Sequence, residues 1–144
     1  MPSSNIALLR QVALFQQVSE GTLEAIDRLS TPRLVESDSY FFHQEDPATH
    51  LYILTQGRVK LHQVTLDGQQ VTLRMITPIM TFGAVAILKS DPVAQDGLPA
   101  GYPASALAIE DSSALAWPAA DFRRLAEKDA ALTLNLMSLM SIYV

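Results

Sequence analysis

The stretch from residue 34 to residue 76 most constrains the fold, because its apolar residues recur with a period of two between regularly spaced turn residues. Val59 and Leu61, for example, alternate with polar residues, as expected for a strand with one buried face. Asp67-Gly68 then supplies a tight turn, where glycine's tolerance of positive φ suits a hairpin. Short antiparallel strands at this spacing predict a jelly roll.

Helical periodicity flanks this β core on both sides. Leu23, Ile26 and Leu29 recur at spacings of three, which predicts that short helices open the domain before Pro32 ends the helical run. After Trp117 the period becomes helical again. The expected fold is therefore mainly β with flanking α-helices, a double-stranded β-helix or jelly roll.

Composition restricts the functional classes. A chain of 144 residues predicts one domain, and the absence of cysteine excludes thiolate-ligated iron–sulfur clusters and cysteine-type zinc sites. The 10 Lys plus Arg against 15 Asp plus Glu give a formal charge of −5, which opposes attraction to a phosphate backbone. We expect no DNA binding by this piece alone. Without a long apolar run or a signal-peptide pattern, we also expect a cytoplasmic protein that does not engage a membrane.

The segment 81–117 carries a recognisable pattern. Phe82-Gly83, a short apolar turn and a later pair of small residues before a strand resemble the phosphate-binding cassette of cyclic nucleotide-binding domains, as in the Crp/Fnr regulators. The candidate ligand-binding residues of this cassette are Phe82, Gly83, Ala84, Val85, Tyr102, Ala104 and Ser105.

Two positions of this cassette depart from the cyclic-AMP binders of the family. The resemblance implies a Glu that holds the ribose hydroxyls and an Arg that pairs with the cyclic phosphate, and these positions are Ala84 and Tyr102 here. A phenol provides neither the charge nor the planar fork of a guanidinium. We therefore expect that cyclic AMP is not the ligand, and the small-molecule effector remains unidentified.

The resemblance covers nearly the whole chain, since residues 43–61 also follow the strand–turn–strand pattern of the family. Glu45 departs from it where the family has Gly, which allows a turn of different shape. The segment from Lys89 to Gly101, rich in Pro and Gly, is interpreted as a loop insertion.

The stretch 132–144 is almost wholly apolar, and a helix of this kind needs cover. The resemblance implies a helix that pairs with its twofold mate in a homodimer and then leads into a helix-turn-helix domain, which is absent from this sequence. We thus expect a β-roll sensor domain over residues 1–128 and the start of a dimerisation helix over 129–144. The alternative is a helix folded back on its own sheet. The candidate dimer residues are Leu132, Leu136, Leu139, Met140 and Tyr143.

Three alternatives to an organic-ligand sensor stay open. Histidines His43, His50 and His62 allow a haem-dependent gas sensor, although solvent-facing positions explain all three. A metal-dependent cupin-like enzyme would use His43 or His50, but the His-x-His spacing is missing and no catalytic residues are recognised, so we expect no enzyme and no metal site. A roll without ligand, serving only for dimerisation, is the third. Tyr52 and Trp117 are interpreted as packing residues, whereas Tyr102 is the best candidate for a functional aromatic.

Overall fold

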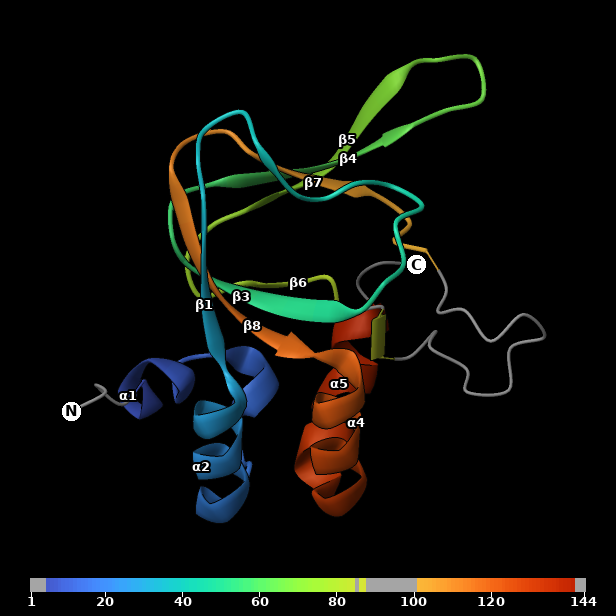
Figure 1. The fold of residues 1–144 in the computed structure, drawn as a ribbon. Helices are drawn as coiled ribbons and strands as arrows, with labels where there is room; N and C mark the ends of the chain where they lie inside the picture. Colours follow the sequence, from blue (N-terminus) through green and yellow to red (C-terminus); the bar gives the residue numbers. More distant parts are fainter. Residues whose placement is uncertain (1–4, 85, 88–100, 142–144) are drawn as a thin grey trace.

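Two four-stranded antiparallel sheets form a roll, and the helices gather at one end of it (Figure 1). The computed structural model describes residues 5–84, 86–87 and 101–141. The first sheet has the order β1 (Thr31–Val35), β8 (Ser112–Pro118), β3 (His50–Gln56) and β6 (Thr81–Phe82). The second has the order β2 (Tyr40–Phe42), β7 (Ser105–Ala108), β4 (Val59–Val64) and β5 (Gln70–Ile76). This arrangement confirms the predicted jelly roll.

The hairpin β4–β5 projects from the roll as its most extended feature (Figure 1). Its turn lies at the predicted place, with Gly68 at φ +85°. The backbone N–H of Gly68 donates to the carbonyl of Thr65, and the N–H of Thr65 donates to that of Gln69. These bonds close the hairpin.

His62 on β4 is buried, with 3% of its surface exposed, so the expectation that it faces solvent is wrong. A β-bulge breaks the register here, because Leu61 pairs with Arg74 whereas His62 pairs with Thr72. Both side chains are therefore buried, and the simple alternation along the strand ends at this point. The ring of Tyr40 lies edge-on to His62, with 5.9 Å between the ring centroids.

The helices before the roll are α1 (Ile6–Leu9), the 3-10 turn η1 (Ala13–Phe15) and α2 (Glu20–Leu29). β1 begins two residues after α2 and includes Pro32, close to the predicted end of the helical run. Trp117 on β8 joins these helices to the sheet, because its indole N–H donates to the carbonyl of Ile26 at 2.7 Å and its ring packs edge-on against Phe15. Trp117 is thus a packing residue, as predicted.

Two helices follow the roll, α4 (Ala119–Lys128) and α5 (Ala130–Ser141). Leu132 and Leu136 on α5 are 0% and 2% exposed, and the Asn135 side-chain amide donates to the carbonyls of Leu14 and Gln16. α5 therefore packs against its own domain, beside η1. Within the described residues, no helix has both the length and the apolar character needed to cross a membrane.

This packing bears on two residues of the predicted dimer surface, Leu132 and Leu136. Leu132 and Leu136 cannot meet a partner because the chain itself buries them, and Leu139 is partly buried against the same core. The side chain of Met140 and the whole of Tyr143 lie outside the described residues. Among the described side chains of α5, Leu134 and Met137 are the exposed large apolar ones, at 62% and 60%.

Candidate functional site

The cassette begins where β6 ends, at Gly83 with φ +77°. A side chain at this position would place its Cβ 3.1 Å from the carbonyl oxygen of His50, so both the conformation and the close approach of β3 favour glycine. The residues that follow turn inward: Ala84 is 3% exposed, and Ala86 and Ile87 are equally buried. Val85 lies outside the described residues. Phe82 also belongs to the core.

Tyr102, at the position where the resemblance implies the phosphate-binding Arg, is 3% exposed. Its ring stacks on Phe42 with 3.7 Å between centroids and 12° between planes. Its hydroxyl donates to the carbonyl oxygen of His50 at 2.6 Å and accepts from the backbone N–H of His50 at 3.0 Å. Burial raises the pKa of Tyr102 to about 12, so the phenol stays neutral. Tyr102 therefore joins the cassette to β3 and brings no charge to it.

The remaining cassette residues are held in the same compact arrangement. Ala104 and Ser105 are each 6% exposed, and the Ser105 hydroxyl accepts a hydrogen bond from the backbone N–H of Gln44 at 2.8 Å. The neighbouring turn has Glu45 at φ +76°, the left-handed conformation that glycine adopts readily. Its N–H donates to the carbonyl of Tyr102. Glu45 thus adopts the backbone conformation that favours glycine.

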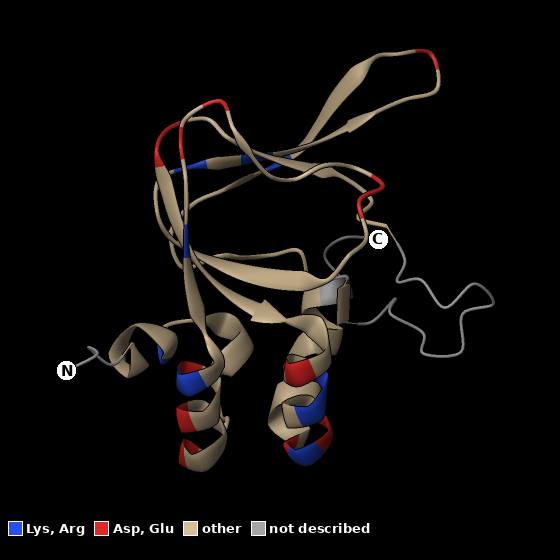
Figure 2. Ribbon diagram, in the orientation of Figure 1, with Lys and Arg blue, Asp and Glu red and all other residues tan. Residues whose placement is uncertain are grey.

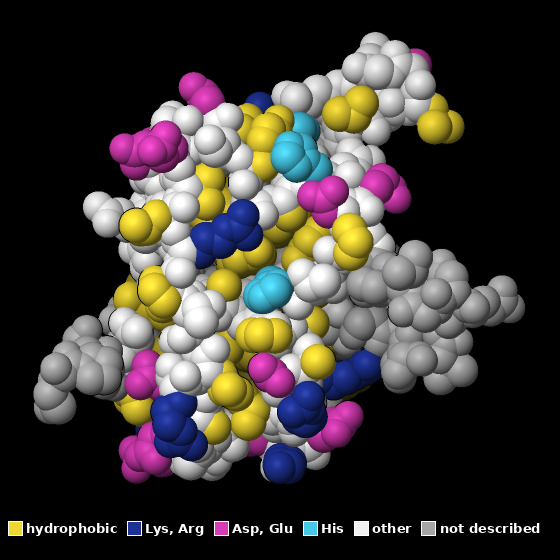
Figure 3. Space-filling model, viewed as in Figure 1, with side chains coloured by type: hydrophobic (Ala, Val, Ile, Leu, Met, Phe, Trp, Pro, Cys, Tyr) yellow, Lys and Arg dark blue, Asp and Glu magenta, His cyan; other side chains and the backbone are white. Residues whose placement is uncertain are grey.

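A pocket of about 480 Å³ opens between β1, β2 and β3. Figure 3 shows a hollow on this face, with hydrophobic side chains recessed between basic and histidine side chains at the surface. Tyr102 is the one described cassette candidate among its lining residues. The lining residues are Thr31, Pro32, Arg33, Phe41, Phe42, Asp46, Pro47, Thr49, His50, Tyr52, Tyr102 and Ala116.

Arg33 provides the positive charge of this pocket. Its guanidinium lies 5.4 Å from the ring centroid of Phe41 and 5.5 Å from that of Tyr52, and its Nη1 donates to the Tyr52 hydroxyl at 2.6 Å. Elsewhere on the strands charged residues are sparse, and most of those coloured in Figure 2 lie on the helices and loops. Arg33 therefore lies against an aromatic wall and near few other charges.

Two ionisable groups beside Arg33 have shifted pKa values. Burial lowers the pKa of His50 and the positive charge of Arg33 lowers it further. The His50 ring is also oriented by a hydrogen bond of 2.8 Å between its Nδ1 and the Thr49 hydroxyl. Burial raises the pKa of the Tyr52 phenol, although Arg33 acts in the opposite direction. At neutral pH this wall thus has one cation beside a neutral imidazole and a neutral phenol.

Sequence reasoning missed Arg33, His50 and the aromatic pair Phe41 and Phe42 as pocket residues. A signal for Arg33 was present, since it lies two positions before the buried Val35 and alternation places both on the same face of β1. The three histidines lie in different surroundings, and within the described part of the chain no group of three or more His, Asp or Glu side chains is placed to hold a metal ion.

Comparison with known proteins agrees with the fold. Residues 32–129 match the family described as cyclic nucleotide-binding domain. The anaerobic regulatory protein of Bacillus subtilis is 25% identical over 127 residues, which are 88% of this chain and 50% of that protein. The cyclic AMP receptor protein of Thermus thermophilus is 29% identical over 109 residues, or 76% of this chain and 46% of that protein. The chain thus spans about half the length of these curated relatives.

Solved structures show the same roll. The sensor domain of the transcriptional regulator DNR from Pseudomonas aeruginosa superposes with a TM-score of 0.80 at 24% identity, covering 95% of this chain and 86% of that one. The match of the family over most of the chain, together with the two antiparallel sheets, settles the assignment. The chain belongs to the cyclic nucleotide-binding domain family and is similar to the sensor domains of Crp/Fnr-type transcription regulators.

Proposed function

We propose that this chain is the effector-sensing domain of a Crp/Fnr-like transcription regulator, that it acts as a homodimer in the cytoplasm, and that its effector is not cyclic AMP. The proposal rests on Tyr102, whose neutral hydroxyl is hydrogen-bonded to the backbone N–H and the carbonyl oxygen of His50. DNA would be bound through a domain outside this sequence. An effector would change DNA binding only if it binds one of two dimer arrangements more tightly than the other.

The cassette lacks both of the side chains that the resemblance implies for a cyclic nucleotide. Ala84 is a buried methyl group that cannot accept hydrogen bonds from ribose hydroxyls, and Tyr102 is a neutral phenol turned toward β3. A phosphate placed here would lose a charge-assisted, bidentate contact and find no other cation among the described cassette residues.

Calorimetric and thermal-shift titrations of the purified domain with cyclic AMP and cyclic GMP test the proposal. A ligand at about 100 times its Kd stabilises the folded state by about 2.7 kcal/mol, which a melting curve resolves easily. We expect no shift for the wild type at millimolar nucleotide. The double variant Ala84→Glu/Tyr102→Arg restores the missing groups, and Tyr102→Phe is its control for loss of the hydroxyl. Saturable micromolar binding of cyclic AMP by the wild type would contradict the proposal.

A haem-dependent gas sensor on the same fold is the second candidate, because His50 lines the pocket and its ring is held by Thr49. When bound, haem would supply the iron that takes up a diatomic gas, and His50 is the residue that would hold it. Reconstitution with haem distinguishes the two candidates: a Soret band that is lost in His50→Ala favours haem. The absence of a Soret band after reconstitution favours an organic effector, and a band unaffected by the substitution excludes His50 as the haem ligand.

Two further alternatives have less support. A cupin-like enzyme needs a set of metal ligands in one cavity, whereas His43 lies in an exposed turn and His62 is buried beneath Tyr40. A roll that serves only for dimerisation and binds no ligand does not require an Arg-lined pocket of about 480 Å³. The similar proteins described above are named as a regulatory protein, a receptor protein and the sensor domain of a regulator, and we propose that this chain is not an enzyme.

A further inference from the structure

The pocket beside Arg33 has features that the cassette does not explain. We define the Arg33 pocket by Arg33, Phe41, Phe42, His50, Tyr52 and Tyr102. We propose that the Arg33 pocket binds a small organic carboxylate with a planar, apolar body. This proposal rests on the proposed function and deepens it by naming a class of effector for the pocket that Tyr102 shares with the cassette.

Arg33 has unused hydrogen-bonding capacity. A guanidinium has five N–H donors, and the Tyr52 hydroxyl accepts from one of them. Within the described residues no carboxylate forms an ion pair with Arg33. Asp46 lines the same pocket, but its Oδ2 accepts from the backbone N–H of His43 at 2.9 Å and lies 3.6 Å from His43 Nδ1. The cation therefore lacks a counter-ion of its own.

The Tyr52 hydroxyl adds a second donor next to the guanidinium. Because its oxygen accepts from Arg33, its own hydrogen can be donated to a ligand. Burial keeps the pKa of Tyr52 above its ordinary value, so the hydroxyl retains this hydrogen at neutral pH. Arg33 and Tyr52 together match an acceptor with two oxygens in one plane, which is a carboxylate.

The rest of the pocket favours a planar, apolar body. Phe41 and Phe42 both line the pocket, and Tyr102 stacks on Phe42 with 3.7 Å between ring centroids. A volume of about 480 Å³ falls within the usual range for small-molecule sites. The single positive charge of Arg33 also favours a monoanion over a phosphate dianion, because burial and Arg33 itself keep the neighbouring His50 neutral. An aromatic carboxylate fits all three requirements.

Binding can be measured with 2-naphthoate as the probe and 2-naphthalenemethanol as its neutral counterpart, using calorimetry and backbone amide chemical shifts. We expect 2-naphthoate to bind the wild type and the neutral alcohol to bind more weakly. Arg33→Gln should weaken 2-naphthoate by at least about tenfold, the factor typical of a lost hydrogen bond to a charged group. The same substitution should leave the weaker binding of the alcohol unchanged.

Controls separate recognition from folding. Arg58→Gln removes an exposed Arg between β3 and β4, and this variant should bind 2-naphthoate like the wild type. Arg33→Lys retains the charge without the fork and should have intermediate affinity, and Tyr52→Phe should lose affinity by a smaller factor. Melting curves of each variant show whether it is folded.

A titration of His50 gives an independent readout, because a bound anion offsets the charge of Arg33. The His50 pKa should rise on addition of 2-naphthoate in the wild type but not in Arg33→Gln. Failure of 2-naphthoate to bind, or equal affinity in wild type and Arg33→Gln, would overturn the proposal. Either result leaves the cyclic-nucleotide titrations unaffected, so the two proposals can fail separately.

Discussion

At the scale of single residues, Glu45 shows strain that a substitution can relieve. Its φ of +76° lies in the left-handed region, which costs a residue with a Cβ about 1–2 kcal/mol. Glu45→Gly should raise the free energy of unfolding by about 0.5–1 kcal/mol, since the greater freedom of glycine in the unfolded chain offsets part of the gain. Urea denaturation measures the difference. Glu45→Ala is the control, because it loses the same carboxylate but keeps the strain, and a gain as large in Ala would contradict this explanation.

His62 is a second residue with a measurable effect, because neither ring nitrogen has a hydrogen-bond partner among the described residues. Burial lowers the pKa of His62, and Lys60 and His43 add to the shift. The unfolded chain binds a proton near pH 6.5, whereas folded His62 binds one only at lower pH. Stability from this group is therefore complete above pH 6.5 and falls on acidification below it. His62→Leu should reduce the loss of stability between about pH 6.5 and pH 5, as measured by melting curves across this range. His50→Gln should act in the same direction, since the His50 pKa is lowered too. A loss of stability on acidification that is the same in His62→Leu as in the wild type would contradict the explanation.

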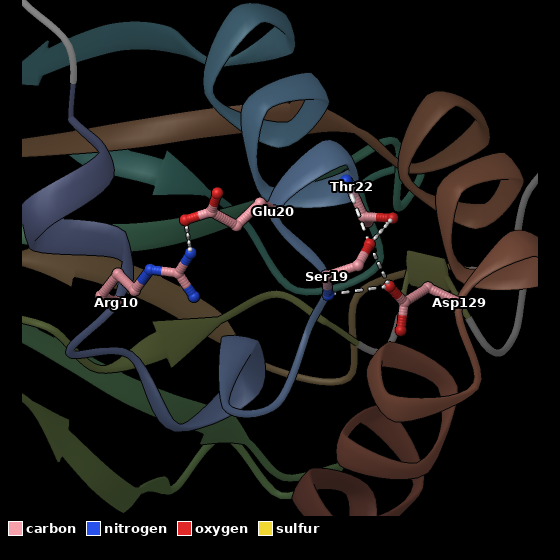
Figure 4. A network of polar contacts seen from close by, with 5 residues as sticks. All are labelled: Arg10, Ser19, Glu20, Thr22 and Asp129. Carbon is pink, nitrogen blue, oxygen red and sulfur yellow. Dashed lines mark hydrogen bonds and ion pairs between the residues drawn. The ribbon is translucent and has the colours of Figure 1, made fainter.

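At the scale of elements, Asp129 links two helix N-termini that are far apart in sequence (Figure 4). Its Oδ2 accepts from the backbone N–H and hydroxyl of Ser19, which caps α2, while its Oδ1 accepts from the N–H groups of Ala131 and Leu132 in α5. Burial tends to raise the pKa of Asp129, but these hydrogen bonds outweigh it and hold the pKa below its ordinary value. The adjacent pair Arg10–Glu20 is exposed and contributes little.

Removing the hydrogen bonds of Asp129 should destabilise the N-terminus of α5 most. Asp129→Ala should lower the free energy of unfolding by about 1 kcal/mol, the usual effect of losing a helix cap, and Asp129→Asn should lower it less because the amide oxygen still accepts. A depressed folded pKa stabilises the fold above the unfolded value of 3.8 and the contribution disappears as pH falls through the folded pKa. In both variants, the part of the loss of stability near pH 4 that arises from Asp129 should therefore disappear. A free energy of unfolding that depends on acidic pH as in the wild type would contradict this.

The sequence predicts elements better than it predicts the pocket, for a physical reason. The strand period and the Asp67-Gly68 turn are local signals, so the roll could be recognised from neighbouring residues. The pocket depends on register: Thr31 and Tyr52 both pair with Ala116 of β8, which brings β1 and β3 to one wall. Such pairings join residues tens of positions apart, and the bulge that buries His62 has no glycine or proline to mark it.

At the scale of the whole molecule, the exposed face of α5 decides how two copies would associate. Leu134 and Met137 lie three residues apart on one face of the helix and are more than half exposed, whereas the inner face is already used by Leu132 and Leu136. We therefore expect the domain to dimerise through Leu134 and Met137 rather than through Leu132 and Leu136. Leu134→Lys/Met137→Lys should give a folded monomer in sedimentation velocity, because neither side chain supports the core. Its melting temperature should fall only by the stabilisation that dimerisation provides.

A matched control adds charge elsewhere. Leu66, at the tip of the β4–β5 hairpin, is fully exposed, and Leu66→Lys should leave the dimer intact. The two variants separate a specific helix–helix contact from a general effect of added charge on a chain of net charge −5. A wild type that stays monomeric at high concentration would remove the basis for coupling effector binding to a dimer. A monomeric Leu66→Lys variant would instead indicate that the dimer interface lies at the β4–β5 hairpin and not at α5.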